Sequence, residues 1–167
     1  MKKVLLSIFV VLIMLSCGEK VSVKEVKELE SKVLAKGAKP TKEEVIQLID
    51  AYILFAKQNP NDSQSPEFLF KALDVAVGVN AEGPQKAIDI ANVLIEKYPD
   101  FEMTQMAMFV KGFVYEDIIG DLQNAEMTYR QFIEKYPNSP IVEDVKATLE
   151  NLGLTPEELV RKFEEAN

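Results

Sequence analysis

AEMTYRQFIEKYPNSP, residues 125–140, is the stretch that decides the fold. Its apolar residues Ala125, Tyr129, Phe132 and Ile133 lie at i, i+4, i+7 and i+8, which places them on one face of a helix. Pro137 ends that helix, because proline lacks a backbone N–H and cannot continue the hydrogen-bond ladder. The same offsets recur 38 residues earlier, before Pro99, in Ala87, Ala91, Leu94 and Ile95, and a tyrosine, Tyr136 or Tyr98, precedes each proline. A repeat of this length is typical of stacked helix pairs.

A weaker third copy precedes Pro60, 39 residues before Pro99, with Leu48, Tyr52, Phe55 and Ala56 at the same offsets. Further helix ends are predicted by a capping box at Thr41 and Glu44, by an N-cap at Ser65 before Pro66, and by a C-cap glycine at Gly153. The predicted helices span residues 24–36, 42–57, 66–79, 84–98, 102–119, 122–135, 140–153 and 156–165. No stretch alternates with period two, as a half-buried strand would. The sequence therefore predicts an all-α fold, an α-solenoid of stacked antiparallel helix pairs with about three repeats and a capping helix.

The N-terminus has the pattern of a secretory leader. A positive segment, Met1–Lys3, precedes an apolar run at residues 4–15 that only Ser7 interrupts, and Ser16 and Cys17 follow. Twelve helical residues rise about 18 Å, too little for a bilayer core of about 30 Å but suited to a signal peptide. The expected organisation is a signal peptide at 1–16, a tether at 17–23 and a helical domain at 24–167.

The end of this leader resembles that of bacterial lipoproteins, in which a peptidase cuts before a lipidated cysteine. The resemblance implies lipidation of Cys17, including a palmitate. Gly18 after the cysteine implies, by analogy with known sorting rules, an outer-membrane lipoprotein facing the periplasm, with the cell surface as the alternative. An ordinary cleaved signal peptide and an uncleaved anchor with an incidental cysteine remain the other interpretations.

Composition argues against several kinds of chemistry. The chain has no histidine, its only cysteine is Cys17, and its formal net charge is −8. A Ser-His-Asp relay and a His/Cys zinc site cannot be assembled from these residues, and the D-x-D-x-D-G calcium loop is absent. We therefore expect that the protein is not an enzyme, that it has no catalytic residues, and that it binds no metal and no cofactor. Because the mature chain is acidic overall, its net charge does not favour binding to nucleic acid or to an anionic membrane.

Residues 107–137 resemble a tetratricopeptide repeat (TPR) through Gly112, Tyr115, Gly120-Asp121, Ala125, Tyr129 and Pro137. Two departures are that Gly112 lies one residue further from the turn than usual and that Phe132 replaces a small residue. The ending FIEKYPNSP is similar to that of envelope TPR lipoproteins, such as the TPR component of the outer-membrane β-barrel assembly machinery, and small Bacteroidota-like ones. The resemblance implies that the repeats pack through Ala72, Ala87, Ala91, Tyr98, Pro99, Gly112, Ala125, Tyr129, Tyr136 and Pro137.

The resemblance also implies that the first helix of each pair lines a partner groove. The candidate groove residues are Lys71, Met103, Met106, Lys111 and Tyr115. Lys71 and Lys111 each precede a small residue, and together they would suit an acidic partner segment. The simpler interpretation is that the lysines are solvated and that the methionines fill the core.

The leading functional hypothesis is a membrane-anchored scaffold for protein–protein interaction in the bacterial cell envelope, with an unidentified envelope protein or peptide as partner. One alternative is a glycan-binding surface lipoprotein, which the absence of Trp disfavours. The other is a carboxylate-dependent envelope hydrolase, which no residue spacing supports.

Overall fold

The computed structural model of the chain describes residues 20–79 and 83–165, and Phe163 by its backbone only. The predicted signal peptide and Cys17 lie outside these residues. Within the described ranges every regular element is helical, which confirms the all-α solenoid. The helices are α1 (Val23–Val33), α2 (Lys42–Gln58), α3 (Gln64–Val77), α4 (Gly83–Lys97), α5 (Thr104–Phe113), the π-helix η1 (Val114–Ile119), α6 (Leu122–Lys135), α7 (Val142–Glu150) and α8 (Pro156–Glu165).

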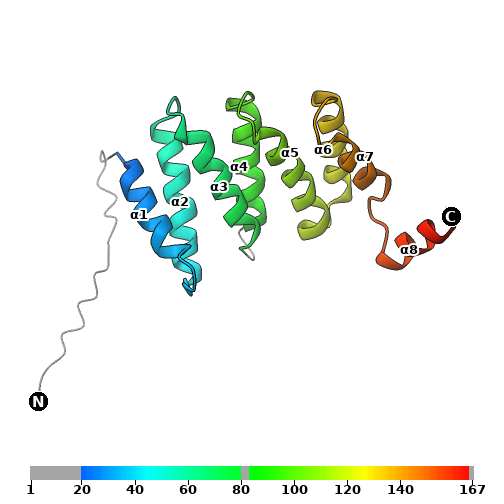
Figure 1. Cartoon of the computed structure of the whole chain (residues 1–167), viewed down its shortest axis with the longest axis horizontal. Helices are drawn as coiled ribbons and strands as arrows, with labels where there is room; N and C mark the ends of the chain where they lie inside the picture. The colour runs from blue at the N-terminus through cyan, green and yellow to red at the C-terminus, as the bar shows by residue number, and fades with distance from the viewer. Residues whose placement is uncertain (1–19, 80–82, 166–167) are drawn as a thin grey trace, which may run out of the picture.

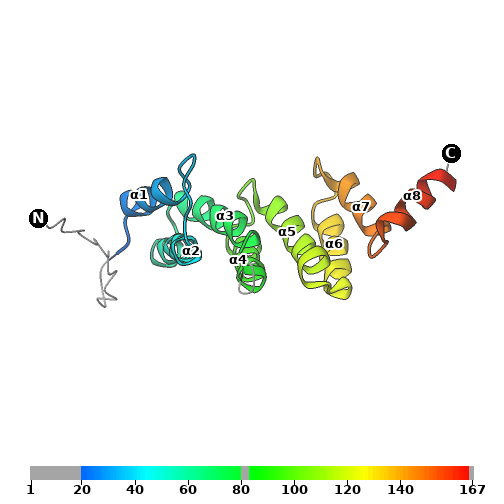
Figure 2. The same ribbon diagram turned by 90° about the horizontal axis from the view of Figure 1, so that it is seen from below.

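The helices form an elongated array of two layers. Figure 2 shows α1, α3, α5 and α7 in one layer, the first-helix layer, and α2, α4 and α6 in the other, the second-helix layer. Each helix from α1 to α7 contacts the next along the chain. In Figure 1, α1 and α8 lie at opposite ends of the long axis. None of the described side chains of α8 is buried, whereas α1 buries Val26 and Val33.

The folded domain begins a few residues before residue 24, where the sequence predicted its start. Ser22 caps α1 and forms a capping box with Glu25, and the Val21 N–H donates to Oε1 of Gln58 at 2.7 Å. Val21 and Val23 pack against the core. The segment expected to be a tether up to residue 23 is therefore packed from Val21 onward. The capping box predicted at Thr41 and Glu44 is confirmed at the start of α2.

A loop with the same hydrogen bonds connects successive helix pairs three times. In each copy, the carbonyl of the residue before the proline accepts a hydrogen bond from the N–H three residues later. The carbonyl of that later residue then accepts a hydrogen bond from the N–H three residues further on. The copies are Asn59–Asp62–Ser65, Tyr98–Phe101–Thr104 and Tyr136–Ser139–Val142, with N···O distances of 2.9–3.1 Å. The weak copy around Pro60 thus shares its backbone geometry with the two strong ones.

Ser65 has a different role from the N-cap that the sequence predicted. Helix α3 begins at Gln64 with Ser63 as N-cap. The fully buried Ser65 hydroxyl instead donates to the Asn59 carbonyl at 2.5 Å, and the fully buried Thr104 hydroxyl donates to the Tyr98 carbonyl at 2.6 Å. Both hydroxyls close the loop that joins one repeat to the next.

The single helix predicted over 102–119 is two segments, α5 and the π-helix η1. A π-helix uses i→i+5 hydrogen bonds and accommodates one extra residue within an otherwise α-helical path. This explains why Gly112 stands one residue further from the turn than the repeat pattern expects. Gly120, with φ +77°, ends η1 in the left-handed region, and the Asp121 N–H then donates to the Tyr115 carbonyl at 2.7 Å.

The core consists of two clusters. The larger one joins α1 to α5, and the smaller one joins α5, α6 and α7 around Tyr129 and Phe132. The last first-layer helix, α7, is shorter than the predicted 140–153. It ends at Glu150, and Gly153, with φ +76°, lies in the following turn rather than at the end of the helix.

Candidate interaction surface

Lys71 lies in the first-helix layer, but its charge is already paired. Its Nζ lies 2.8 and 3.0 Å from the two carboxylate oxygens of Glu30 in α1. The ammonium also lies 5.9 Å from the ring centroid of Phe68, within the range of a cation–π contact. The structure therefore gives Lys71 a role in joining α1 to α3, and a partner carboxylate would have to compete with Glu30.

Lys111 occupies the matching place in α5 and differs from Lys71. Its side chain is half-buried, its Nζ lies 6.0 Å from the centroid of the Tyr115 ring, and no described carboxylate comes within ion-pair distance. Burial lowers the pKa of Lys111, and the Glu96 carboxylate of α4 acts in the opposite direction. Half-buried cations are costly without an anionic partner. Of the two predicted lysines, Lys111 is the one with room for such a partner.

The methionines of α5 are divided between surface and core. Met103 precedes the helix, Met106 lies in its first turn, and both are partly exposed. Met108 is buried in the smaller core cluster. Only Met103 and Met106 therefore remain available to a partner.

Tyr115 packs against both core clusters, so its ring supports Lys111 rather than standing free. Its neighbour Glu116 accepts a 2.8 Å hydrogen bond from the buried Tyr129 hydroxyl. Burial raises the pKa of the Glu116 carboxyl, while that hydrogen bond lowers it. These contacts join η1 to α6 and leave Glu116 in a structural role.

The residues that the resemblance assigns to repeat packing differ in how deeply they are buried. Gly112 and the alanines Ala72, Ala87, Ala91 and Ala125 are buried, as is Tyr129. The two tyrosines before the prolines are half-buried, and the Tyr98 hydroxyl donates to the Pro60 carbonyl of the preceding repeat at 3.0 Å. Pro99 and Pro137 are exposed, so their contribution is to end α4 and α6 rather than to pack.

An open hollow of about 520 Å³, which the sequence did not predict, lies along α1. It is lined by Lys27, Glu30, Ser31, Leu34 and Ala35. These residues are spaced i, i+3, i+4, i+7 and i+8, which is the sequence signal that they share one helix face. The hollow combines a free lysine with Leu34, whose side chain is 53% exposed.

The described residues form neither a cluster of metal ligands nor a membrane-spanning helix. No group of three His, Cys, Asp or Glu side chains lies close enough there to hold a metal ion. No helix within residues 20–79 and 83–165 is both long and apolar enough to cross a bilayer.

Comparison with known families identifies one segment of the chain. Residues 106–139 match the family model of the tetratricopeptide repeat, over about a fifth of the sequence. The matched segment runs from α5 through η1 and α6 into the following loop, and includes Lys111. No curated protein matches the chain. The chain thus contains a tetratricopeptide repeat within an all-helical solenoid, and such repeats generally mediate protein–protein interaction.

Proposed function

We propose that the protein is a lipid-anchored scaffold of the bacterial cell envelope that binds a protein partner through its first-helix layer. The observation that carries the proposal is the stacked array around the matched repeat, in which Lys111 is half-buried without a carboxylate partner among the described residues. Solenoids of this kind bind through extended surfaces built by several repeats. The leader that precedes Cys17 supports the anchor, and Gly18 favours the outer membrane with the domain in the periplasm.

The anchor is tested by replacing Cys17 with serine. Palmitate labelling in the producing bacterium is expected to be lost in Cys17→Ser, because serine offers no thiol for lipidation. Ser16→Ala keeps a small residue before the cleavage site and is expected to retain the label. Separation of inner and outer membranes then tests the location of the labelled protein. Palmitate that persists in Cys17→Ser would show that the anchor assignment is wrong.

Partner binding is tested by photo-crosslinking in the producing bacterium. A photoreactive residue at Met106 in α5 is expected to form adducts with envelope proteins, whereas the same residue at Met127, 48% exposed on α6, is not. In the Met106 background, Lys111→Glu should reduce the adducts at least fivefold, because it places a like charge against the proposed acidic partner segment. Equal adducts at both methionines, or no adducts at Met106, would contradict a partner surface on the first-helix layer.

A further inference from the structure

The net charge of the chain conceals a strong asymmetry between its ends. Residues 20–42 contain seven lysines and three glutamates, for a net charge of +4, whereas residues 43–167 contain ten basic and 23 acidic residues, for −13. Charge asymmetry of this size within one chain is a signal of interaction with a charged surface. The basic part consists of α1, the loop after it and the first residue of α2, which together form one end of the array (Figure 1).

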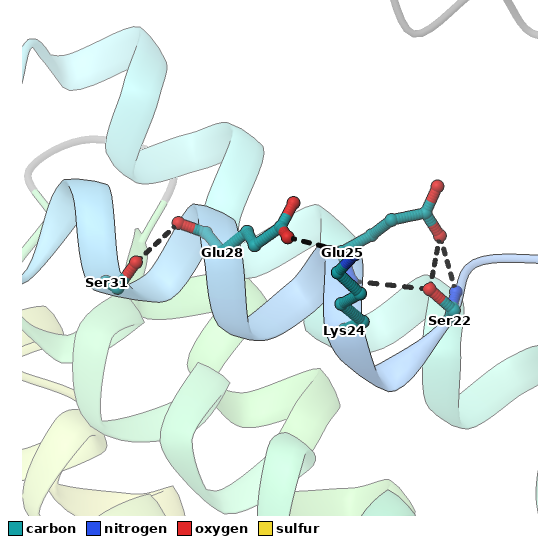
Figure 3. A network of polar contacts seen from close by, with 5 residues as sticks. All are labelled: Ser22, Lys24, Glu25, Glu28 and Ser31. Carbon is teal, nitrogen blue, oxygen red and sulfur yellow. Dashed lines mark hydrogen bonds and ion pairs between the residues drawn. The ribbon is translucent and has the colours of Figure 1, made fainter.

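Most of these lysines are free of internal partners. Lys24 pairs with Glu28 at 3.7 Å and Lys32 with Glu44 at 2.9 Å. Figure 3 shows the Lys24–Glu28 pair beside the Ser22–Glu25 capping box and the Ser31–Glu28 hydrogen bond on α1. The other five are exposed, and none has a described carboxylate within ion-pair distance. These five residues, here called the basic end, are Lys20, Lys27, Lys36, Lys39 and Lys42.

The basic end lies next to the proposed lipid anchor. Val21 is already held by Gln58 and by the core, so only three residues, 18–20, lie between Cys17 and the packed part of the chain. The four steps from the Cα of Cys17 to the Cα of Val21 span at most about 14 Å when fully extended. A lipid at Cys17 would therefore keep α1 close to the headgroup layer of the membrane.

A membrane interacts only with those charges of the protein that lie within about a Debye length of its surface. At physiological ionic strength the Debye length is about 8 Å, and neighbouring packed helices are about 8–10 Å apart. The charges of α1 and α2 therefore decide the interaction of this end with a membrane, and residues 20–58 carry a net charge of +2 when Glu43, Glu44, Asp50 and Lys57 are included. Each lysine near an anionic bilayer strengthens binding about fivefold. Leu34 beside Lys27 adds an exposed apolar group that suits the interface between headgroups and acyl chains.

We propose that the basic end lies against a bilayer of anionic phospholipids and holds the array upright, with α8 furthest from the membrane. The position in the cell rests on the lipid anchor proposed above. The contact itself is a property of the lysines and of the anionic headgroups. It gives the protein a second membrane signal besides a lipid chain, and it leaves the first-helix layer accessible to a partner from the side.

The experiment supplies the anchor chemically, so that it does not depend on lipidation in the cell. The chain from Cys17 to Asn167 retains both described core clusters, whose members lie between Val21 and Leu152, and therefore the whole packed fold. Its single thiol is coupled to a maleimide-bearing lipid in vesicles of phosphatidylcholine, with or without about one-third phosphatidylglycerol. A water-soluble amine-acetylating reagent is then added, and acetylation of each lysine is followed by mass spectrometry.

Lysines of the basic end are expected to be acetylated at least threefold more slowly on the anionic vesicles than on the neutral ones. Lys97 and Lys135 are also exposed but lie on α4 and α6 of the second-helix layer, away from α1, and their rates should not differ between vesicles. High salt should abolish the protection. In a second variant, Lys27→Gln, Lys36→Gln and Lys39→Gln together should remove the protection of Lys42, whereas glutamine at the two control lysines should preserve it.

Equal acetylation of the basic end on both vesicles would overturn the inference and leave the lipid anchor standing. Conversely, palmitate that persists in Cys17→Ser would overturn the anchor and leave the vesicle result standing. Protection that is as large at the control lysines as at the basic end would show that the array lies flat, and would also overturn the inference.

Discussion

Replacing Gly112 by alanine is expected to lower the free energy of unfolding by about 3 kcal/mol, at the upper end of the usual cost of overpacking a core. A Cβ at this position would lie 2.7 Å from Cδ1 of Tyr129 and closer still to Cε1. Tyr129 cannot move aside easily, because it is fully buried and its hydroxyl is held by Glu116 at 2.8 Å. Urea unfolding followed by far-UV circular dichroism measures the loss.

Gly78→Ala is the matched control for this change. Gly78 lies at the end of α3 with φ −81°, and a Cβ there would meet only the Val75 carbonyl oxygen, at 3.6 Å. We expect its free energy of unfolding to change by about 0.5 kcal/mol or less, or to rise, because alanine restricts the unfolded chain. If both variants behaved alike, the close approach of α6 to α5 at Gly112 would not be a requirement of the fold.

Replacing Phe68 by alanine is expected to lower the free energy of unfolding by about 3–5 kcal/mol, the usual cost of removing a buried phenyl ring. Phe68 in α3 is 1% exposed, and its ring centroid lies 5.4 Å from that of Tyr52 and 5.0 Å from that of Phe55, both in α2. These contacts join the first helix pair to the second. Because an array of repeats depends on nearest-neighbour contacts, α2 and α3 should lose hydrogen-exchange protection before α6 does.

Phe113→Ala removes the same ring from a different environment. Phe113 is 39% exposed near the end of α5, so its loss should cost about 1 kcal/mol or less and leave hydrogen exchange in α2 and α3 unchanged. Similar losses in the two variants would show that Phe68 does not couple the first two helix pairs.

Local sequence patterns predicted the helices well because their causes are local. The prolines after Asn59, Tyr98 and Tyr136 end helices by removing a backbone donor, and the Thr41–Glu44 box begins one by satisfying two. Predictions failed where a longer-range contact changed a local preference. Ser65 has the chemistry of an N-cap, but its burial and its bond to the Asn59 carbonyl place it inside the helix.

The candidate interaction residues show a different limit. Lys71 and Lys111 have similar sequence surroundings, each before a small residue, and only the structure distinguishes them. Glu30, 41 residues before Lys71, neutralises it from the neighbouring helix of the same layer, and no described acidic side chain does the same for Lys111. Pairing of this kind depends on how the helices stack, so helical periodicity within one segment cannot reveal it.

By itself, the sequence determined that the chain forms helix pairs, that they repeat every 38 or 39 residues, and that no strand is needed to bury their apolar faces. These properties follow from the spacing of apolar residues along each helix and from the residues that begin and end it. Tertiary structure alone decided three other properties. One extra residue is accommodated as the π-helix η1, the ring of Tyr129 packs where a side chain at Gly112 would lie, and Lys71 rather than Lys111 is paired with a carboxylate. The physical reason is that each depends on how one helix packs against another, which the pattern within a single helix does not set.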